Sequence, residues 1–265
     1  MATADPLDRT SRSGLWLTMA LAVLAAVLGS FNGLGRFDQI LYDRAVSATG
    51  RDADPDILIV AIDDASIDAL GRWPWRRAVH AALLDQLHGA RAIGMDLIFA
   101  EADTVNPNDD RILADSIRRN GHTVLPAVLD RLNRPSGIGV PIPALAQAAA
   151  AMGFINARMD PDGAVREAAL TTQVAGQRWN HMAISMLEVG GEAQRAQSLL
   201  RRAQPDGSIL IPYAGPTAHV RTVPYLSVLR GDLSPDELRG KYVLVGAWAT
   251  GLGDAYPTPV SHEVS

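Results

Sequence analysis

The longest apolar run of the chain lies close to its start. Residues 14–35 contain no charged side chain, and Arg12 and Arg36 bound this segment. A helix of about 20 apolar residues is long enough to cross the hydrocarbon core of a bilayer. Trp16 and Phe31 lie near the two ends of the run, where aromatic rings favour the membrane interface. The pattern therefore predicts one transmembrane helix over 14–35.

A cleaved signal peptide is the alternative interpretation of this run. The apolar region of a signal peptide is typically about 7–15 residues long, which is shorter than the run observed. Residues 28–35, which close the run, contain no convincing small-x-small cleavage site, so an uncleaved anchor is favoured. Two arginines precede the run (Arg9, Arg12) and two follow it (Arg36, Arg44). The positive-inside rule therefore does not decide the orientation.

A short helix and a linker are predicted after the apolar run. Phe37, Ile40, Leu41 and Arg44 recur at the spacing of one helical face. Residues 50–56 then combine glycine, proline and three aspartates, which is typical of a linker. A separate domain is expected from about this point onward.

In that domain, strand-like and helix-like patterns alternate. Continuous apolar runs at 57–62, 92–99 and 123–129 predict strands that are buried on both faces. The segments 77–90 and 109–121 have helical periodicity and reach a glycine at their ends. Strands that alternate with helices indicate parallel βαβ units.

The later part of the domain departs from this alternation. Residues 160–163, with the sequence Asp-Pro-Asp-Gly, suit a type I turn that would join 153–159 to 164–174 as antiparallel strands. A further turn is expected at 175–177. The other expected elements are helices at 141–153 and 180–191, a strand at 208–213, and a short helix followed by a buried strand within 234–248.

The predicted fold class is therefore α/β. We expect a mixed, mainly parallel sheet flanked by helices, with an antiparallel excursion, preceded by one N-terminal transmembrane helix.

Composition and charge exclude several function classes. The net charge of −5 at pH 7 provides no basic field for nucleic acid. The chain has no cysteine, which excludes disulfides, thiolate catalysis and cysteine-based zinc sites. Glycine-rich nucleotide loops and the serine-hydrolase motif are absent. His80 and His88 would stand about 12 Å apart on one helix, too far to share a metal. No cofactor is predicted.

Acidic side chains gather around the ends of the first two predicted strands. Asp63 and Asp64 close the first strand, Asp96 lies in the second, and Asp103 follows in its loop. Ligands of open parallel sheets bind beyond the carboxyl ends of the strands. Three such carboxylates could hold Mg²⁺ or Ca²⁺, which would make the protein a membrane-tethered, metal-dependent hydrolase. The favoured interpretation is structural, with aspartates that cap helices or bond to neighbouring loops, so no catalytic and no metal residue is predicted.

The Trp-Pro-Trp-Arg-Arg segment begins the next predicted helix. Pro74 suits the first turn of a helix, and it places Arg76 and Arg77 near the positive end of the helix dipole. Cations are unfavourable there unless anions are close. We expect Asp63 and Asp64 to be those anions, so that the four side chains form a structural ion network.

The functional alternative for this segment is a binding site. Arg76 and Arg77 would then face an open pocket and bind an anionic ligand, with Trp73 or Trp75 stacking nearby. The candidate ligand-binding or structural rim comprises Asp63, Asp64, Trp73, Trp75, Arg76, Arg77, Asp96 and Asp103.

Several sequence blocks together indicate a family. In chain order they are FDQILYDR, ILIVAIDDASIDALGRWPWRRAVHAALLDQL, ARAIGMDLIFAEAD, DDRILADSIRRNG, PIPALAQAAAAMGFINARMDPDGAVRE and LRGKYVLVGAWATGLGDAYPTPVS. Over about residues 37–261 the chain resembles the second type of CHASE domain, the cyclases/histidine-kinases associated sensory extracellular domain. The Asp-Asp-x-Ser block followed by Trp-Pro-Trp-x-Arg is specific.

The resemblance implies a bacterial sensor in the inner (cytoplasmic) membrane, with its N-terminus inside the cell. Family members continue into further membrane helices and a cytoplasmic output, which is a nucleotide cyclase, a diguanylate cyclase or phosphodiesterase, or a kinase. Their ligands are largely undefined, so no binding residue is transferred. The chain itself is expected to be no enzyme.

On this basis we expect an unknown small ligand or envelope component as partner, and a homodimer formed through the membrane and stalk helices. Because the chain stops at Ser265, the C-terminal membrane helices and the output domain are expected to be missing. The predicted organisation is a cytoplasmic tail at 1–13, the membrane helix at 14–35, a stalk and linker at 36–55, and an extracytoplasmic sensory domain at 56–265.

Overall fold

The computed structural model describes residues 16, 18, 19, 39–46, 52–129, 137–214, 220–252 and 256–260. Its internal contacts divide the chain into two units, Met1–Gly50 and Arg51–Ser265.

The first unit is helical wherever it is described. Trp16, Thr18 and Met19 have helical conformation, and residues 39–46 form a short helix, in agreement with the stalk helix predicted from the spacing of Ile40 and its neighbours. No helix among the described residues is long and apolar enough to cross a bilayer. Most of the membrane helix predicted over 14–35 lies outside the described residues, as does the predicted tail.

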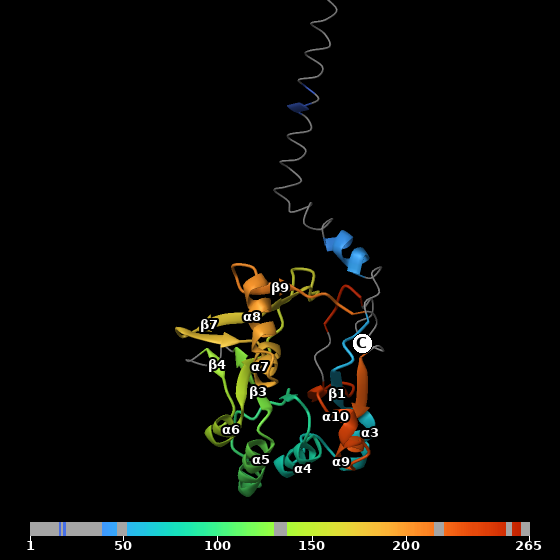
Figure 1. The fold of residues 1–265 in the computed structure, drawn as a ribbon, viewed down its shortest axis with the longest axis vertical. Coiled ribbons are helices and arrows are strands. Elements are labelled where there is room, and N and C mark those ends of the chain that lie inside the picture. The colour runs from blue at the N-terminus through green and yellow to red at the C-terminus, as the bar shows by residue number, and fades with distance from the viewer. Residues whose placement is uncertain are drawn as a thin grey trace, which may run out of the picture. The chain divides into compact units, whose positions relative to one another are not determined.

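A mainly parallel sheet of seven strands forms the centre of the described part of the second unit (Figure 1). Its order is β10-β1-β11-β2-β3-β4, and β5 also pairs with β3. All pairs are parallel except β3 with β4. The strands are β1 (Ile57–Ile62), β2 (Ala92–Met95), β3 (Thr123–Leu129), β4 (Ile138–Gly139), β5 (Ala151–Phe154), β10 (Arg221–Pro224) and β11 (Tyr242–Ala247).

The last of these strands along the chain lies between the first two. In the register of the sheet, Ile57 is opposite Tyr242 and Ile62 is opposite Ala247. On its other side β11 pairs with β2, so that Val245 is opposite Met95. The mixed, mainly parallel α/β fold predicted from the sequence is confirmed.

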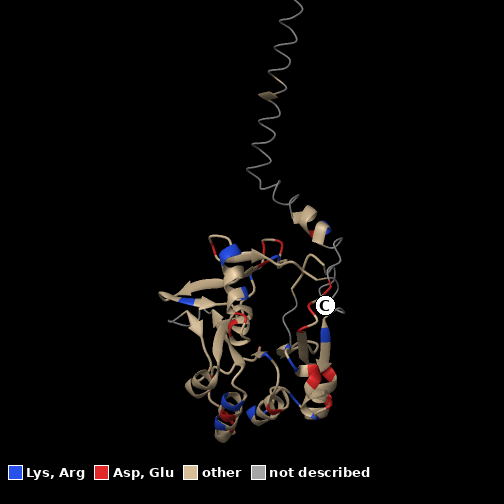
Figure 2. Cartoon of the chain, viewed as in Figure 1, with Lys and Arg blue, Asp and Glu red and all other residues tan. Residues whose placement is uncertain are grey.

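One face of the sheet carries the main hydrophobic core. Alternate strand residues, such as Leu58, Val60 and Val245, point to this face and are fully buried. The helices that cover it lie together at the bottom of Figure 1. They are α3 (Asp64–Leu70), α4 (Arg77–Gln86), α5 (Pro107–Asn120), α6 (Pro143–Ala148), α9 (Tyr225–Leu229) and α10 (Pro235–Leu238). Two of them, α4 and α5, carry both acidic and basic residues (Figure 2).

The second face is packed against α7 (Met182–Val189), on which α8 (Ala193–Arg202) lies. Met182 and Met186 of α7 contact the sheet beside Ala92 and Val124. Gly153 permits the close approach of α7, because a Cβ there would stand 2.4 Å from the Met182 Cα. Among the described elements, α7 packs over β2, β3 and β5, whereas the same face of β1 and β11 borders a cleft.

The antiparallel excursion consists of two small pairs. β6 (Glu167–Ala169) pairs with β9 (Ser208–Leu210), and β7 (Thr171–Val174) pairs with β8 (Gln177–Asn180). Ala175 and Gly176, both with positive φ, form the turn between β7 and β8, which confirms the turn predicted at 175–177.

Three local predictions are wrong. Residues 153–159 do not pair with 164–174 beyond a single bridge between Arg158 and Glu167, because the start of that segment is β5, which joins β3 in the main sheet. The helix predicted over 141–153 ends at Ala148, because residues 151–154 form β5. The strand predicted over 92–99 ends at Met95, beyond which the chain turns into the loop that holds Asp96 and Asp103.

Candidate functional site

The two adjacent aspartates after β1 have separate structural roles. Asp63 is the N-cap of α3, and its Oδ1 accepts a hydrogen bond from the Ser66 amide at 3.0 Å, as a capping aspartate does. Asp64 begins the helix, and its Oδ2 accepts from the Thr250 hydroxyl at 3.4 Å. The predicted ion network of these aspartates with Arg76 and Arg77 is wrong, since the arginines bind two other carboxylates.

Arg76 binds the first turn of α5. Its Nε and Nη2 donate to the two carboxylate oxygens of Asp109, both at 3.0 Å. The Asp109 side chain is only 2% exposed, whereas that of Arg76 lies mostly in solvent. Hydrogen bonds from Arg76, together with the Ala78 amide, hold the pKa of Asp109 below its usual range.

Arg77 is enclosed by the same helix and the loop before it. Its guanidinium forms an ion pair with Asp110 and donates to the carbonyl of Glu101. Its Cζ also lies 5.5 Å from the centre of the Phe99 ring. Both members of the pair are largely buried. The anions that compensate the start of α4 thus come from the start of α5, 33 residues further along the chain.

The two tryptophans of the Trp-Pro-Trp segment belong to an aromatic cluster. The rings of Trp73 and Trp75 meet edge to face with centroids 5.1 Å apart, and Trp75 lies 4.9 Å from Tyr225. The Trp75 indole N–H donates to the Gly71 carbonyl at 2.7 Å. His80 and Tyr225 share a buried hydrogen bond of 2.8 Å between Nδ1 and the hydroxyl.

Burial sets the ionisation of the polar members of this cluster. It lowers the pKa of His80 to about 4 and raises that of Tyr225. The imidazole is therefore neutral at pH 7. The tryptophans anchor α9 and the α3–α4 connection to the core. Their rings pack on each other, on His80 and on Tyr225.

Asp103 and Asp96 lie in the loop after β2 and differ in role. The Asp103 Oδ1 accepts from the amides of Val105 and Asn106 at 3.0 and 2.7 Å, which shapes the turn before α5. Asp96 instead lies exposed at the carboxyl end of β2 and lines a cleft. No group of three or more His, Asp or Glu among the described residues could hold a metal ion. The eight candidate residues therefore do not form one site.

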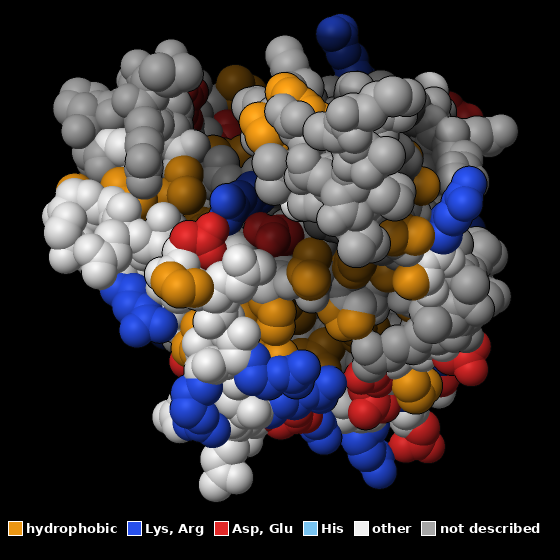
Figure 3. All heavy atoms as spheres, turned by 90° about the horizontal axis from the view of Figure 1, so that it is seen from above, with side chains coloured by type: hydrophobic (Ala, Val, Ile, Leu, Met, Phe, Trp, Pro, Cys, Tyr) orange, Lys and Arg blue, Asp and Glu red, His pale blue; other side chains and the backbone are white. Residues whose placement is uncertain are grey.

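The cleft beside Asp96 is the better candidate. It has a volume of about 460 Å³ and lies between the second face of β1 and β11 and the helices α7 and α8; we refer to it as the sheet cleft. The described residues that line it are mostly apolar: Ile57, Ile59, Ile155, Met182, Ala183, Met186, Leu187, Leu199, Tyr242, Leu244, Val245, Gly246, Ala247 and Trp248, with Asp54, Asp96, His181 and Arg195. Figure 3 shows hydrophobic side chains in a hollow near the middle of the view from above.

Strand alternation explains the floor of the sheet cleft. Residues i and i+2 of a strand point to the same face, so Ile57 and Ile59 of β1 lie on this face beside Tyr242 and Leu244 of β11, and Gly246 follows on the same face. Because Gly246 has no side chain, it leaves a hollow in the floor. Among the described residues, a Cβ at this position would meet the Cβ of Asp96, at 3.7 Å.

The polar residues of the sheet cleft lie at its margins. Arg195 is bound by the carboxylates of Glu192 at 3.0 Å and Asp54 at 3.7 Å. His181 caps α7, because its Nδ1 accepts from the Ala183 amide at 3.2 Å. Burial lowers the pKa of His181, which keeps the ring neutral at pH 7. Trp248 is 53% exposed at the carboxyl end of β11.

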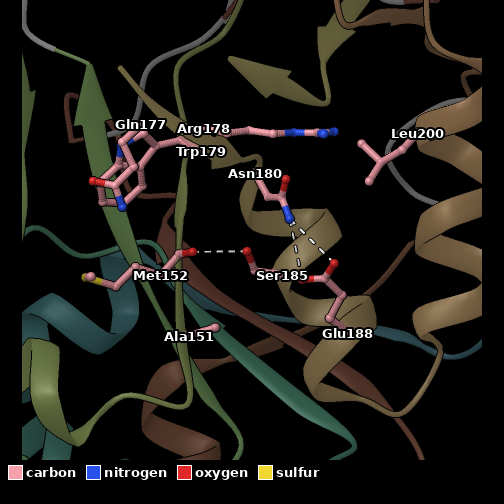
Figure 4. A pocket seen from close by; sticks show the side chains of 9 residues that line it. All are labelled: Ala151, Met152, Gln177, Arg178, Trp179, Asn180, Ser185, Glu188 and Leu200. Atoms are coloured by element: carbon pink, nitrogen blue, oxygen red, sulfur yellow. Dashed lines mark hydrogen bonds between the residues drawn. The ribbon is translucent and has the colours of Figure 1, made fainter. Parts of the chain in front are cut away.

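A second depression, of about 540 Å³, lies beside β8 and α7 (Figure 4). Figure 4 shows Asn180 and Glu188 facing each other, and the Asn180 amide donates to the carboxylate at 3.4 Å. The Ser185 hydroxyl donates to the Met152 carbonyl at 3.0 Å. Asn180, Glu188 and Ser185 thus already have partners within the protein, which makes this depression the weaker candidate.

Sequence reasoning found Asp96 but missed the sheet cleft around it. The signal available was Gly246, a glycine within an otherwise apolar central strand, which marks a close approach or an open space. The residues of α7 and α8 that face the cleft could not be assigned without the pairing of β1 with β11.

Comparison with known proteins identifies a family. A family model described as the CHASE2 domain matches residues 19–265, which confirms the resemblance found in the sequence. No curated protein and no solved structure matches the chain.

Proposed function

The chain belongs to the CHASE2 family, a sensory extracellular domain of signalling proteins, and on that premise we propose that it is the input domain of a bacterial membrane signal-transduction protein. The observation that carries the proposal is the extent of the family match, which begins at residue 19 inside the apolar run and includes the whole α/β domain.

The proposal includes a specific arrangement in the cell. Residues 14–35 anchor the protein in the inner membrane, residues 1–13 lie in the cytoplasm, and the domain from residue 56 onward lies outside. The uncharged stretch 14–35 supports the anchor, and the extracellular placement of the CHASE2 family supports the orientation. An α/β domain without cysteine folds in an oxidising compartment without forming disulfides.

The proposed mechanism is a population shift. A ligand that binds one arrangement of the domain better than another stabilises that arrangement. In a homodimer joined through the membrane and stalk helices, the shift would move these helices relative to each other. A cytoplasmic cyclase, diguanylate cyclase or phosphodiesterase, or kinase would then change its activity.

The alternative of a metal-dependent hydrolase has little support from the geometry. The Asp63 and Asp103 carboxylates bind backbone amides, and Arg76 and Arg77 engage the carboxylates of α5. These contacts suit a folded scaffold, whereas the sheet cleft offers the apolar surface that small-molecule sites use.

The proposed location is tested with reporter fusions at the C-terminus of the full chain in a bacterial host. Alkaline phosphatase, which is active only outside the cytoplasm, should be active in this fusion, and a green fluorescent protein exported by the same route should be dark. Deletion of 14–35 should abolish the phosphatase activity. A fluorescent and phosphatase-inactive pair of fusions would contradict the proposed arrangement.

A further inference from the structure

The second face of the sheet is partly uncovered at its centre. Parallel sheets are usually covered on both faces, because the crossover helices lie on both. Here β1 and β11 are neighbouring inner strands, yet Ile59, Leu244 and Gly246 on this face remain partly exposed. Accessible apolar surface at the centre of a sheet is costly unless something binds it.

The sheet cleft above this surface has the size of a small-molecule site. Its volume of about 460 Å³ lies within the roughly 300–1,000 Å³ of such sites. All described residues that line it belong to the unit Arg51–Ser265, so the cleft is a recess of one folded body. A recess this small favours a small molecule over a protein partner, whose stable interface usually buries more than about 1,000 Å².

The walls of the sheet cleft can adapt to an apolar ligand. Met182 and Met186 line it from α7, and Leu199 lines it from α8. The unbranched side chain of methionine follows the shape of an apolar partner without a fixed geometry. On the floor, Gly246 leaves a hollow in which the ligand gains contact with the sheet.

The charged groups that line the sheet cleft are already engaged within the protein. Arg195 is bound by the carboxylates of Glu192 at 3.0 Å and Asp54 at 3.7 Å. Asp54 also accepts a hydrogen bond from the Asp56 amide at 3.0 Å, and Asp96 is not without a partner either. A charged ligand would therefore lose its hydration without gaining an unpaired counter-charge from the described lining residues.

The other ionisable groups of the sheet cleft carry no charge at pH 7. His181 is neutral, because burial lowers its pKa, and its Nδ1 already accepts from the Ala183 amide. Burial raises the pKa of Tyr242, so the phenol is neutral as well. The described lining residues thus offer a ligand an apolar surface without a free charge.

We propose that the sheet cleft binds an uncharged, apolar small molecule, which lies against Ile59, Leu244 and Met186. This inference names the ligand class of the proposed sensor and rests on that function for its biological meaning. The binding itself is measured without reference to cellular location or signalling. A failed location test would therefore leave the binding result intact, and a failed binding test would leave the location intact.

The test uses three probes with one apolar body and different polar ends: 4-phenylbutan-1-ol, 4-phenylbutylamine and 4-phenylbutanoate. The full chain is reconstituted in nanodiscs of phosphatidylcholine. Binding is measured by isothermal titration calorimetry, with empty nanodiscs as the reference for partition into lipid. We expect saturable binding of the alcohol, with an affinity at least about tenfold above that of the amine and of the carboxylate.

Two variants locate the binding site in the sheet cleft. Gly246→Leu fills the hollow in the floor and should lower the affinity for the alcohol at least about tenfold. Ala183→Phe places a ring at the margin of the cleft from an exposed position of α7, and it should lower the affinity at least about threefold. The matched control is Ala193→Phe, at an exposed position of α8 that does not line the cleft, and it should leave the affinity unchanged.

Circular dichroism of each variant establishes that its fold is native, and the exposed position of Ala183 keeps the test independent of the folding of Gly246→Leu. The proposal is overturned if the alcohol does not bind the parent chain, or if the amine or the carboxylate binds as tightly as the alcohol. It is also overturned if a natively folded Gly246→Leu or Ala183→Phe chain binds the alcohol as well as the parent chain. If no probe binds and Gly246→Leu changes the oligomeric state, a second copy of the chain is the occupant instead.

Discussion

At the scale of single residues, the conspicuous Asp-Asp and Trp-Pro-Trp-Arg-Arg motifs explain local structure. Asp63 caps α3, the arginines at the start of α4 bind carboxylates at the start of α5, and the tryptophans lie against His80 and Tyr225. The side chains of these motifs thus have partners within the protein. Single-sequence reasoning located these residues at the strand ends but could not identify their partners.

His80 makes stability depend on pH in a defined window. Its folded pKa of about 4 lies below the value near 6.5 of an exposed histidine, so the unfolded chain binds the proton more readily. The stability that the neutral His80 contributes is fully present above pH 6.5 and is lost as the pH falls toward 4. This loss amounts to about 3 kcal/mol of the free energy of unfolding. His181 acts in the same direction.

Urea denaturation of the full chain between pH 7.5 and 4 measures this effect. His80→Gln, which can still bond to the Tyr225 hydroxyl, should show a smaller loss of stability on acidification than the parent chain. The same substitution at exposed His88 should leave the loss unchanged. Parallel pH profiles for the parent and His80→Gln would show that the buried imidazole does not contribute.

At the scale of elements, the sequence was most informative where a segment is buried on both faces. The strands at 57–62 and 123–129 were predicted with the observed bounds. A short, continuous apolar run is typical of a strand that is buried on both faces of a parallel sheet. The antiparallel pairing of 153–159 was wrong, because a turn at 160–163 specifies a reversal but not which strands then pair. Residues 151–154 instead form β5, which pairs with β3 in the main sheet.

The packing of α7 on the sheet gives a prediction at this scale. In Gly153→Ala the new Cβ would meet the Met182 backbone at 2.4 and 2.6 Å, whereas in Gly94→Ala it would meet the end of a side chain, the Met186 sulfur, at 2.6 Å. Backbone atoms yield less easily than a methionine side chain. We expect losses of about 3 kcal/mol for Gly153→Ala and about 1 kcal/mol for Gly94→Ala.

Chemical denaturation of the two variants under identical conditions measures the difference. Equal losses would mean that α7 shifts freely over β5, contrary to the close contact described. A larger loss for Gly94→Ala would place the rigid contact at β2.

At the scale of the whole molecule, the division into two units has a thermodynamic meaning. The buried apolar residues of the described chain lie between Leu58 and Pro259, within the unit Arg51–Ser265. A unit that contains its own core is expected to fold by itself. The sheet cleft could not be derived from the sequence at this scale, because strands and helices far apart along the chain line it.

Residues 51–265, expressed without the first unit, should therefore unfold cooperatively. We expect a melting temperature within about 5 °C of the corresponding transition of the full chain, since the core is unchanged. Near-ultraviolet circular dichroism during heating measures the transition. Loss of the near-ultraviolet signal with retained helical content would show that the core requires the first unit.

The position of β11 has a consequence for biosynthesis. The strand that separates β1 from β2 is the last along the chain among the described strands, so the sheet cannot close while the ribosome is still making the earlier segments. Until Tyr242–Ala247 emerges from the ribosome, β1 and β2 lack the strand that lies between them. A chain that is truncated before this strand would leave the sheet incomplete and would be degraded by proteases. The domain thus completes its central sheet only after β11 has emerged, which would suit the passage through a translocon that the proposed location requires.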